Sequence, residues 1–130
     1  NKKKYKNIYK NKDEWVKCDL NNVKKNISKF INDYSKNYIF IEGDVRETLN
    51  IQNNLPEKIS LLRLDTDFYE STLKELEILF PRLEKNGVLI IDDYGHWKGS
   101  KKAVDEYFNL KDDFQWFHRI DYKSRLLIKK

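Results

Sequence analysis

The sequence predicts an α/β fold built on a mainly parallel sheet, with an antiparallel hairpin at its carboxyl end. Three observations lead to this fold class. The run 88–91 is apolar on both faces, as expected of a central parallel strand, and 59–64 forms a second strand of similar length. A helical pattern joins these two strands, as in a right-handed crossover. Two further short runs, 114–120 and 125–128, flank a turn-forming segment at 121–124.

The predicted order of helices and strands along the whole chain is α-β-α-β-α-β-α-β-β, and its first elements lie before residue 59. An amphipathic helix is predicted from Asp13 or Asp19 onward, because apolar residues recur at helical spacing. These residues are Leu20, Val23, Ile27, Phe30 and Ile31. A short strand at 38–41, about one helical turn at 46–49 and a loop at 53–58 follow.

The helix between the two parallel strands is predicted over 69–83. Its apolar stripe consists of Tyr69, Leu73, Leu76, Phe80 and Leu83. Pro81 is expected to kink or shorten this helix, and Asn86 with Gly87 to end it. A further helix is predicted at 100–108, with its apolar residues turned inward. These are Ala103, Val104, Tyr107 and Phe108.

Composition narrows the class of protein. The chain has 130 residues, enough for one domain, and 39% of them are hydrophobic, so a packed core is feasible. No apolar run approaches the roughly 20 residues of a membrane span, and no signal peptide is visible. The lone Cys18 excludes an internal disulfide and a cysteine-rich metal site, and favours a cytoplasmic location.

The net charge of +5 is unevenly distributed. Residues 1–36 hold 11 lysines and 4 acids, whereas residues 37–130 hold 15 basic and 17 acidic residues. A basic segment with interleaved tyrosines can bind phosphates, so a nucleic-acid-binding module is one alternative. No known recognition fold accompanies it, and we favour a solvated, flexible lead-in at 1–12.

Carboxylates follow both parallel strands directly. Asp65 comes after the first, and Asp92 with Asp93 comes after the second. Because neighbouring strands lie about 4.8 Å apart, these acids should meet at the ligand-binding edge of the sheet. Close carboxylates repel one another unless a cation lies between them, and Mg²⁺ prefers such oxygen ligands. Two structural alternatives remain: Asp92 or Asp93 begins a turn, and Asp67 caps the following helix.

The loop that follows this strand carries further candidates. His96 could orient or deprotonate a substrate hydroxyl, or it could pack within the loop. Tyr94 and Trp97 could line a substrate pocket or serve only packing, and His118 in the hairpin is expected to be structural. With four glycines in all, the chain has no Walker loop, no Gly-x-Gly-x-x-Gly and no Gly-x-Ser-x-Gly elbow. Metal-assisted chemistry at the sheet edge is the function that the motifs favour.

Four segments carry a resemblance to a known family. They are 62–72 (LRLDTDFYEST), 80–83 (FPRL), 87–97 (GVLIIDDYGHW) and 102–108 (KAVDEYF). From about Trp15 to Phe108, the sequence resembles the macrocin O-methyltransferase (TylF/MycF-type) family of class I S-adenosylmethionine-dependent methyltransferases. The expected fold is accordingly part of a Rossmann-like methyltransferase sheet.

The resemblance implies transfer of a methyl group to a hydroxyl of a sugar or glycoside, in a natural product or a surface glycan. The implied cofactors are S-adenosylmethionine and Mg²⁺. The metal ligands would be Asp65, Asp92 and Asp93, with Asp65 also acting in catalysis. Asp44 and Val45 correspond to a loop that borders the adenine of the cofactor.

The sequence departs from the family pattern at its amino-terminal end. The first strand, its glycine-containing loop and the acid that holds the ribose would all precede Asn1. Residues 13–130 are therefore expected to be the carboxy-terminal half of one methyltransferase domain, active only in the full-length protein. A non-catalytic remnant of such an enzyme is the alternative. The sequence leaves open whether the protein forms a homo-oligomer, and it predicts no membrane partner.

Overall fold

The computed structural model describes residues 19–31, 33, 36–109 and 116–130. The chain divides into two compact units, Asn1–Glu42 and Gly43–Lys130. The predicted lead-in at 1–12 and a helix start at Asp13 lie outside the described residues. Within the described part of the chain, no helix is long and apolar enough to cross a membrane.

The first unit contains one described helix, α2 (Leu20–Ile27). Asp19 caps it, because its carboxylate accepts hydrogen bonds from the backbone N–H groups of Asn21 (2.7 Å) and Asn22 (3.2 Å). The predicted helix was too long at its carboxyl end. Phe30 is 86% exposed, so the last apolar residues of the stripe bury too little surface to prolong a short helix.

The strand predicted at 38–41 is not formed. No described strand pairs with this segment, and Ile39 is 90% exposed. A strand is stable only when a neighbouring strand accepts and donates its backbone hydrogen bonds. A short run of apolar residues is therefore not sufficient to form a strand here.

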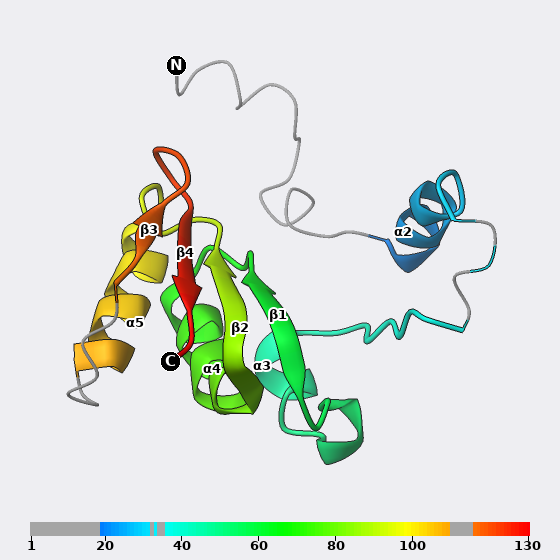
Figure 1. Ribbon diagram of the computed structural model, residues 1–130. Helices are drawn as coiled ribbons and strands as arrows, with labels where there is room; N and C mark the ends of the chain where they lie inside the picture. The colour runs from blue at the N-terminus through cyan, green and yellow to red at the C-terminus, as the bar shows by residue number, and fades with distance from the viewer. Residues whose placement is uncertain (1–18, 32, 34–35, 110–115) are drawn as a thin grey trace. The chain divides into compact units, whose positions relative to one another are not determined.

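The second unit contains a four-stranded sheet in the order β1-β2-β4-β3 (Figure 1). β1 (Ile59–Leu64) and β2 (Leu83–Ile91) run parallel. β4 (Arg125–Ile128) pairs antiparallel with β2 and with β3 (His118–Arg119). The predicted α/β class is confirmed, as are the parallel strand pair and the terminal hairpin. Residues 114 and 115, at the predicted start of the hairpin, lie outside the described residues.

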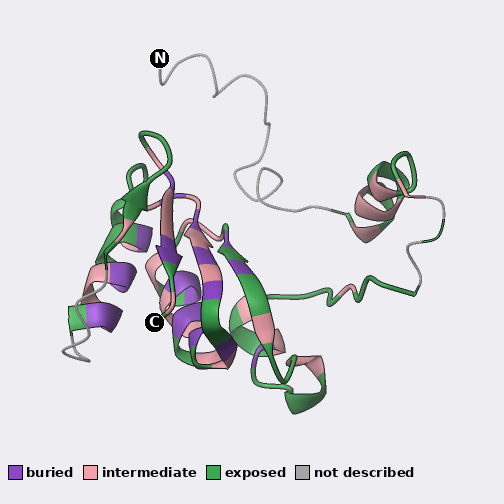
Figure 2. Ribbon diagram, viewed as in Figure 1, coloured by how far each residue is buried: buried purple, intermediate pink, exposed green. Residues whose placement is uncertain are grey.

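Two helices, α4 (Tyr69–Leu79) and α5 (Lys98–Asn109), pack against one face of this sheet. Buried residues accordingly alternate along the strands and line the inner sides of the helices (Figure 2). The core cluster consists of Leu62, Leu64, Leu76, Phe80, Leu83, Leu89, Ile91, Val104, Tyr107, Phe108 and Leu127. The residues predicted to face inward from α5 are all buried, which confirms that helix and its register.

The helix between the parallel strands is shorter than its apolar stripe. α4 ends at Leu79, and a 3-10 turn, η2 (Phe80–Arg82), follows it. Pro81 lies in that turn, and it lacks the backbone N–H that a continuing helix would require. The expected shortening at Pro81 is thus confirmed.

β2 begins five residues earlier than predicted. The backbone N–H of Asn86 donates to Lys129 O (2.8 Å), and the N–H of Lys129 donates to Gly87 O (2.9 Å). The prediction that Asn86 and Gly87 end a helix is therefore wrong, because pairing with the carboxyl end of the chain draws them into the sheet. Asn86 has φ 64°, a local irregularity that a strand tolerates beside a shift in register.

The elements before the sheet are short. α3 (Val45–Thr48) lies where one helical turn was predicted, and η1 (Gln52–Asn54) overlaps the predicted loop. α3 packs against α4. This contact brings the amino ends of two helices to the same part of the second unit.

Candidate functional site at the carboxyl edge of the sheet

β1 and β2 end at the same edge of the sheet. Leu64 pairs with Ile91, and the backbone N–H of Asp92 donates to Leu64 O at 2.9 Å, so the ladder continues one residue beyond β2. The acidic residues that follow the strands are therefore adjacent in space. This confirms the predicted position of the acids at one edge of the sheet.

Three carboxylates converge at this edge. One oxygen from each of Asp65, Asp67 and Asp93 lies within 4.8 Å of the other two. Asp93 is only 6% exposed, and its Oδ2 atom has no hydrogen-bond partner in the described part of the chain. We call these three residues the acidic cluster. Burial and the neighbouring carboxylate of Asp67 raise the pKa of Asp93 to about 6.

Asp67 belongs to the acidic cluster rather than to a helix cap. α4 begins after Phe68, which occupies the N-cap position without a side-chain hydrogen bond. Asp67 has φ 64°, and the N–H of Phe68 donates to Thr66 O at 2.7 Å, so the chain turns sharply here. The prediction that Asp67 caps the helix is wrong. Its spacing of two residues from Asp65 was the signal in the sequence that could have identified it.

Asp92 forms ion pairs with two basic side chains. Its carboxylate pairs with Lys123 Nζ (2.9 Å) and Arg63 Nη2 (3.2 Å), and it lies 3.3 Å from Ser124 Oγ. The hydrogen bond from Lys123 holds the pKa of Asp92 below its ordinary value. Asp92 and Asp93 follow the end of β2 and have different neighbours, two basic side chains for Asp92 and two carboxylates for Asp93. The structure thus brings Asp65 and Asp93 together, as predicted, but places Asp67 in the group instead of Asp92.

Arg63 connects the two sets of acids. Its Nη1 atom lies 2.8 Å from Asp65 Oδ2, while its other terminal nitrogen pairs with Asp92. Burial, together with the charge of Asp92, raises the pKa of Asp65 despite this guanidinium. One arginine at the end of β1 therefore neutralises part of the charge that the edge would otherwise carry.

The loop after β2 is held tightly against the hairpin. The N–H of Gly95 donates to Lys123 O at 2.7 Å, and a Cβ at Gly95 would lie 2.0 Å from Tyr122 O. Only glycine permits this approach of two backbones. The turn that carries Lys123 is thereby kept beside Asp92.

Replacing Gly95 with alanine is expected to lower the free energy of unfolding by at least about 2 kcal/mol, because a backbone must move to admit the methyl group. Chemical denaturation of the variant beside the unmodified protein measures this loss. An unchanged transition midpoint would contradict the close approach of the loop and the hairpin.

The aromatic residues of this loop make packing contacts. The Tyr94 hydroxyl donates to Asp105 Oδ1 (2.6 Å), and the Tyr94 ring stacks on Phe117 with their centroids 6.1 Å apart. The ring of His96 meets those of Trp97 and Tyr122 edge-on, at 5.2 and 6.0 Å. These contacts agree with the packing role considered for the three residues. Their roles in binding or deprotonating a substrate stay predictions.

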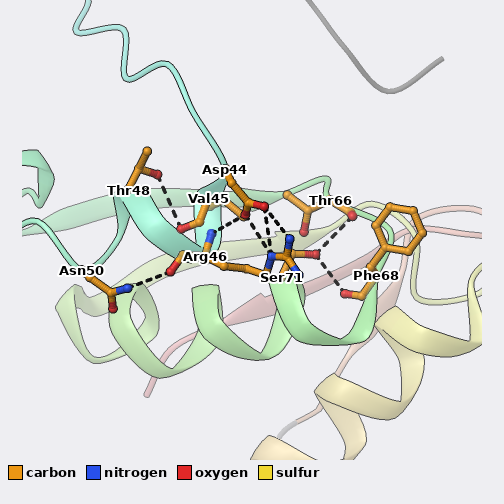
Figure 3. Close-up of polar contacts among 8 residues, drawn as sticks. All are labelled: Asp44, Val45, Arg46, Thr48, Asn50, Thr66, Phe68 and Ser71. Carbon is orange, nitrogen blue, oxygen red and sulfur yellow. Dashed lines mark hydrogen bonds and ion pairs between the residues drawn. The ribbon is translucent and has the colours of Figure 1, made fainter. Parts of the chain in front are cut away.

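Asp44 caps α3 and also binds an arginine (Figure 3). Its Oδ1 accepts from the backbone N–H of Arg46 (2.9 Å), and both carboxylate oxygens contact the Arg46 guanidinium at 2.5 to 3.2 Å. The side-chain hydrogen bond from Arg46 lowers the pKa of Asp44 to about 2. Asp44, the residue predicted to contact the adenine, is thus a charged carboxylate that is already paired with the Arg46 guanidinium.

The fold and the acidic edge define a class of protein. The mixed sheet, with its parallel strand pair and antiparallel end, superposes on solved methyltransferases of the class I fold. The family model of macrocin-O-methyltransferase (TylF) matches residues 1–127, and the chain belongs to this family. The resemblance noted in the sequence is confirmed.

Individual relatives are O-methyltransferases. The chain is 35% identical over 86 residues to demethyldecarbamoylnovobiocin O-methyltransferase of Streptomyces niveus, which covers 60% of this chain and 33% of the relative. It is 54% identical over 50 residues to 8-demethyl-8-(2,3-dimethoxy-alpha-L-rhamnosyl)-tetracenomycin-C 4'-O-methyltransferase of Streptomyces olivaceus, which covers 38% and 19%.

Solved structures give the same assignment. The O-methyltransferase NovP superposes with a TM-score of 0.56 at 34% identity, over 57% of this chain and 31% of NovP. CalS11, a TDP-rhamnose 3'-O-methyltransferase of calicheamicin biosynthesis, superposes with a TM-score of 0.58 at 29% identity, over 68% and 39%. The matched part of the chain spans about a third of the length of these proteins.

Proposed function

We propose that the whole protein is an S-adenosylmethionine-dependent O-methyltransferase that acts on a hydroxyl of a sugar or glycoside, assisted by Mg²⁺. Membership of the TylF family supports the reaction type. Relatives whose names specify a rhamnosyl 4'-O-methyltransferase and a TDP-rhamnose 3'-O-methyltransferase support a sugar hydroxyl as the acceptor. The acceptor would belong to a natural product or a surface glycan.

The observation that carries the metal proposal is the acidic cluster with its unpartnered oxygen. Three carboxylates converge there, and buried Asp93 Oδ2 lacks a hydrogen-bond donor among the described residues. A buried polar atom without a partner is costly, and a hard cation would satisfy it. Mg²⁺ prefers oxygen ligands and keeps sites open for water and substrate. The residues present therefore fit the ion.

The ligand set that we propose is Asp65, Asp67 and Asp93. Asp92, the ligand expected from the family pattern, would have to release Lys123 and Arg63 to join it. In its observed pairing, Asp92 instead holds the hairpin turn beside the acidic cluster. Its proposed role is to position that turn.

The proposed mechanism assigns three tasks to this edge. The acidic cluster would hold the cation, whose positive charge would lower the pKa of a substrate hydroxyl at this edge. His96, on the loop after β2, is the proposed acceptor of the hydroxyl proton. Tyr94 and Trp97 lie within two residues of His96 in the sequence and are the proposed wall of the acceptor pocket.

S-adenosylmethionine would supply the methyl group. We propose Asp44 and Val45, at the start of α3, as the contacts to its adenine. Both oxygens of Asp44 already accept hydrogen bonds from the Arg46 guanidinium, so the adenine amine would have to share this carboxylate with Arg46 or displace it. Arg46 is thus a competitor for the same carboxylate.

The test of this function is methyl transfer by the whole protein from isotopically labelled S-adenosylmethionine to a panel of rhamnosides and TDP-rhamnose. Labelled methyl ethers are expected with Mg²⁺ present and are expected to disappear with excess chelator, and to return when Mg²⁺ is restored. Undiminished transfer in chelator would refute the metal assignment. Transfer to none of the sugars, but to another hydroxyl compound, would refute the acceptor class.

A further inference from the structure

We propose that Glu75 is a positioning residue whose buried carboxyl group, acting through Thr66, holds the loop 65–68 in the conformation that turns Asp65 and Asp67 toward Asp93. Glu75 lies on α4, outside the acidic cluster. The effect of Glu75 on cation binding rests on the function proposed above. The effect of Glu75 on the conformation of the loop does not.

The contact between Glu75 and the loop is specific. Glu75 is 6% exposed, and its Oε2 atom accepts a hydrogen bond from Thr66 Oγ1 at 2.8 Å. Thr66 separates the two acids Asp65 and Asp67 in the sequence. A bond to its side chain therefore anchors the loop at its centre.

Further contacts hold the same loop. The hydroxyl of Ser71 lies 3.1 Å from Phe68 O and 3.3 Å from Thr66 O (Figure 3). α5 approaches closely as well, because a Cβ at Gly99 would lie 2.9 Å from Tyr69 N and 3.6 Å from Asp67 O. The loop is thus enclosed by side chains and backbone of both helices.

This anchoring is needed because the loop is strained. Asp67 has φ 64°, a conformation that residues other than glycine adopt at a cost. Such a conformation persists only where the surrounding structure imposes it. The φ of Asp67 sets the direction of its carboxylate, so a relaxed loop would point Asp67 away from Asp93.

A buried glutamate is a costly way to fill space. An apolar residue of the same length would avoid the desolvation of a carboxyl group. Burial raises the pKa of Glu75 to about 7, which expresses this cost. The acceptor for Thr66 is what the glutamate provides and what an apolar side chain would lack.

The test compares Glu75→Met, which removes the acceptor, with Glu75→Gln, which keeps a carbonyl oxygen at similar length. Thr66→Val removes the donor, and the exposed Glu77→Met is the matched control on the same helix. The readouts are amide hydrogen exchange of residues 65–68 and the affinity for Mn²⁺ measured by electron paramagnetic resonance, both on the whole protein.

Glu75→Met and Thr66→Val are expected to raise hydrogen exchange in the loop and to weaken Mn²⁺ binding roughly 10- to 100-fold, the range for outer-shell partners of a metal site. The double variant is expected to be no worse than either single one, because both remove the same bond. Glu75→Gln and Glu77→Met are expected to leave both readouts within about 3-fold.

Unchanged loop exchange in Glu75→Met would overturn the proposal, as would an equal loss in Glu75→Gln. If Glu75→Met does not fold, Thr66→Val decides the question alone, since it leaves the glutamate in place. Absence of Mn²⁺ binding by the unmodified protein would refute the proposed cation site, and the exchange of the loop would still decide the role of Glu75.

Discussion

Replacing Asp93 with asparagine is expected to lower the affinity for Mg²⁺ more than about 100-fold, and methyl transfer with it. This loss exceeds the roughly 10- to 100-fold effect of outer-shell partners, because the change removes a charged ligand. Asp93 is the buried member of the acidic cluster, and its Oδ2 atom has no other partner among the described residues. Isothermal titration calorimetry of the whole protein measures the affinity directly.

The same measurement on two neighbours separates the ligand set of the structure from that of the sequence. Asp67→Asn is expected to weaken binding about as much as Asp65→Asn, because both residues contribute an oxygen to the acidic cluster. Asp92→Asn is expected to cost less, about 10-fold, since Asp92 faces Lys123 and Arg63. The reverse order, with Asp92 essential and Asp67 dispensable, would restore the ligand set expected from the family pattern.

Replacing Glu75 with glutamine is expected to stabilise the protein at pH 8 by up to about 3 kcal/mol, and to change its stability little at pH 4. Burial raises the pKa of Glu75 from 4.5 to about 7, so the folded state binds a proton more readily than the unfolded state. The stability that this proton confers is fully present below pH 4.5. It is lost as the pH rises through about 7, because folding must then accommodate a buried charge.

Glutamine carries no charge at any pH in this range, so it escapes that loss while keeping an oxygen for Thr66. The free energy of unfolding of both proteins, measured by denaturation from pH 4 to pH 8 with chelator present, gives the difference as a function of pH. The exposed Glu77→Gln is the control and is expected to give no comparable gain. A constant difference across the pH range would show that Glu75 does not titrate between the two states.

Much of the fold was predictable because local pattern and burial agree. The run 88–91 is apolar and lies within β2, and Pro81 marks where α4 gives way to a 3-10 turn. Prediction failed where an element depends on a partner distant in the sequence. The segment 38–41 finds no described strand to pair with, whereas Asn86 is drawn into β2 by Lys129.

The candidate site divides in the same way. The sequence by itself determined that acids gather at the carboxyl edge of two parallel strands, because strand ends and a crossover connection specify that edge. Only the tertiary structure decided which acids converge. Lys123, 31 residues away, binds Asp92, and a positive φ admits Asp67 to the acidic cluster. The direction of a side chain depends on its own backbone angles and on distant charges, and neither can be read from the spacing of residues.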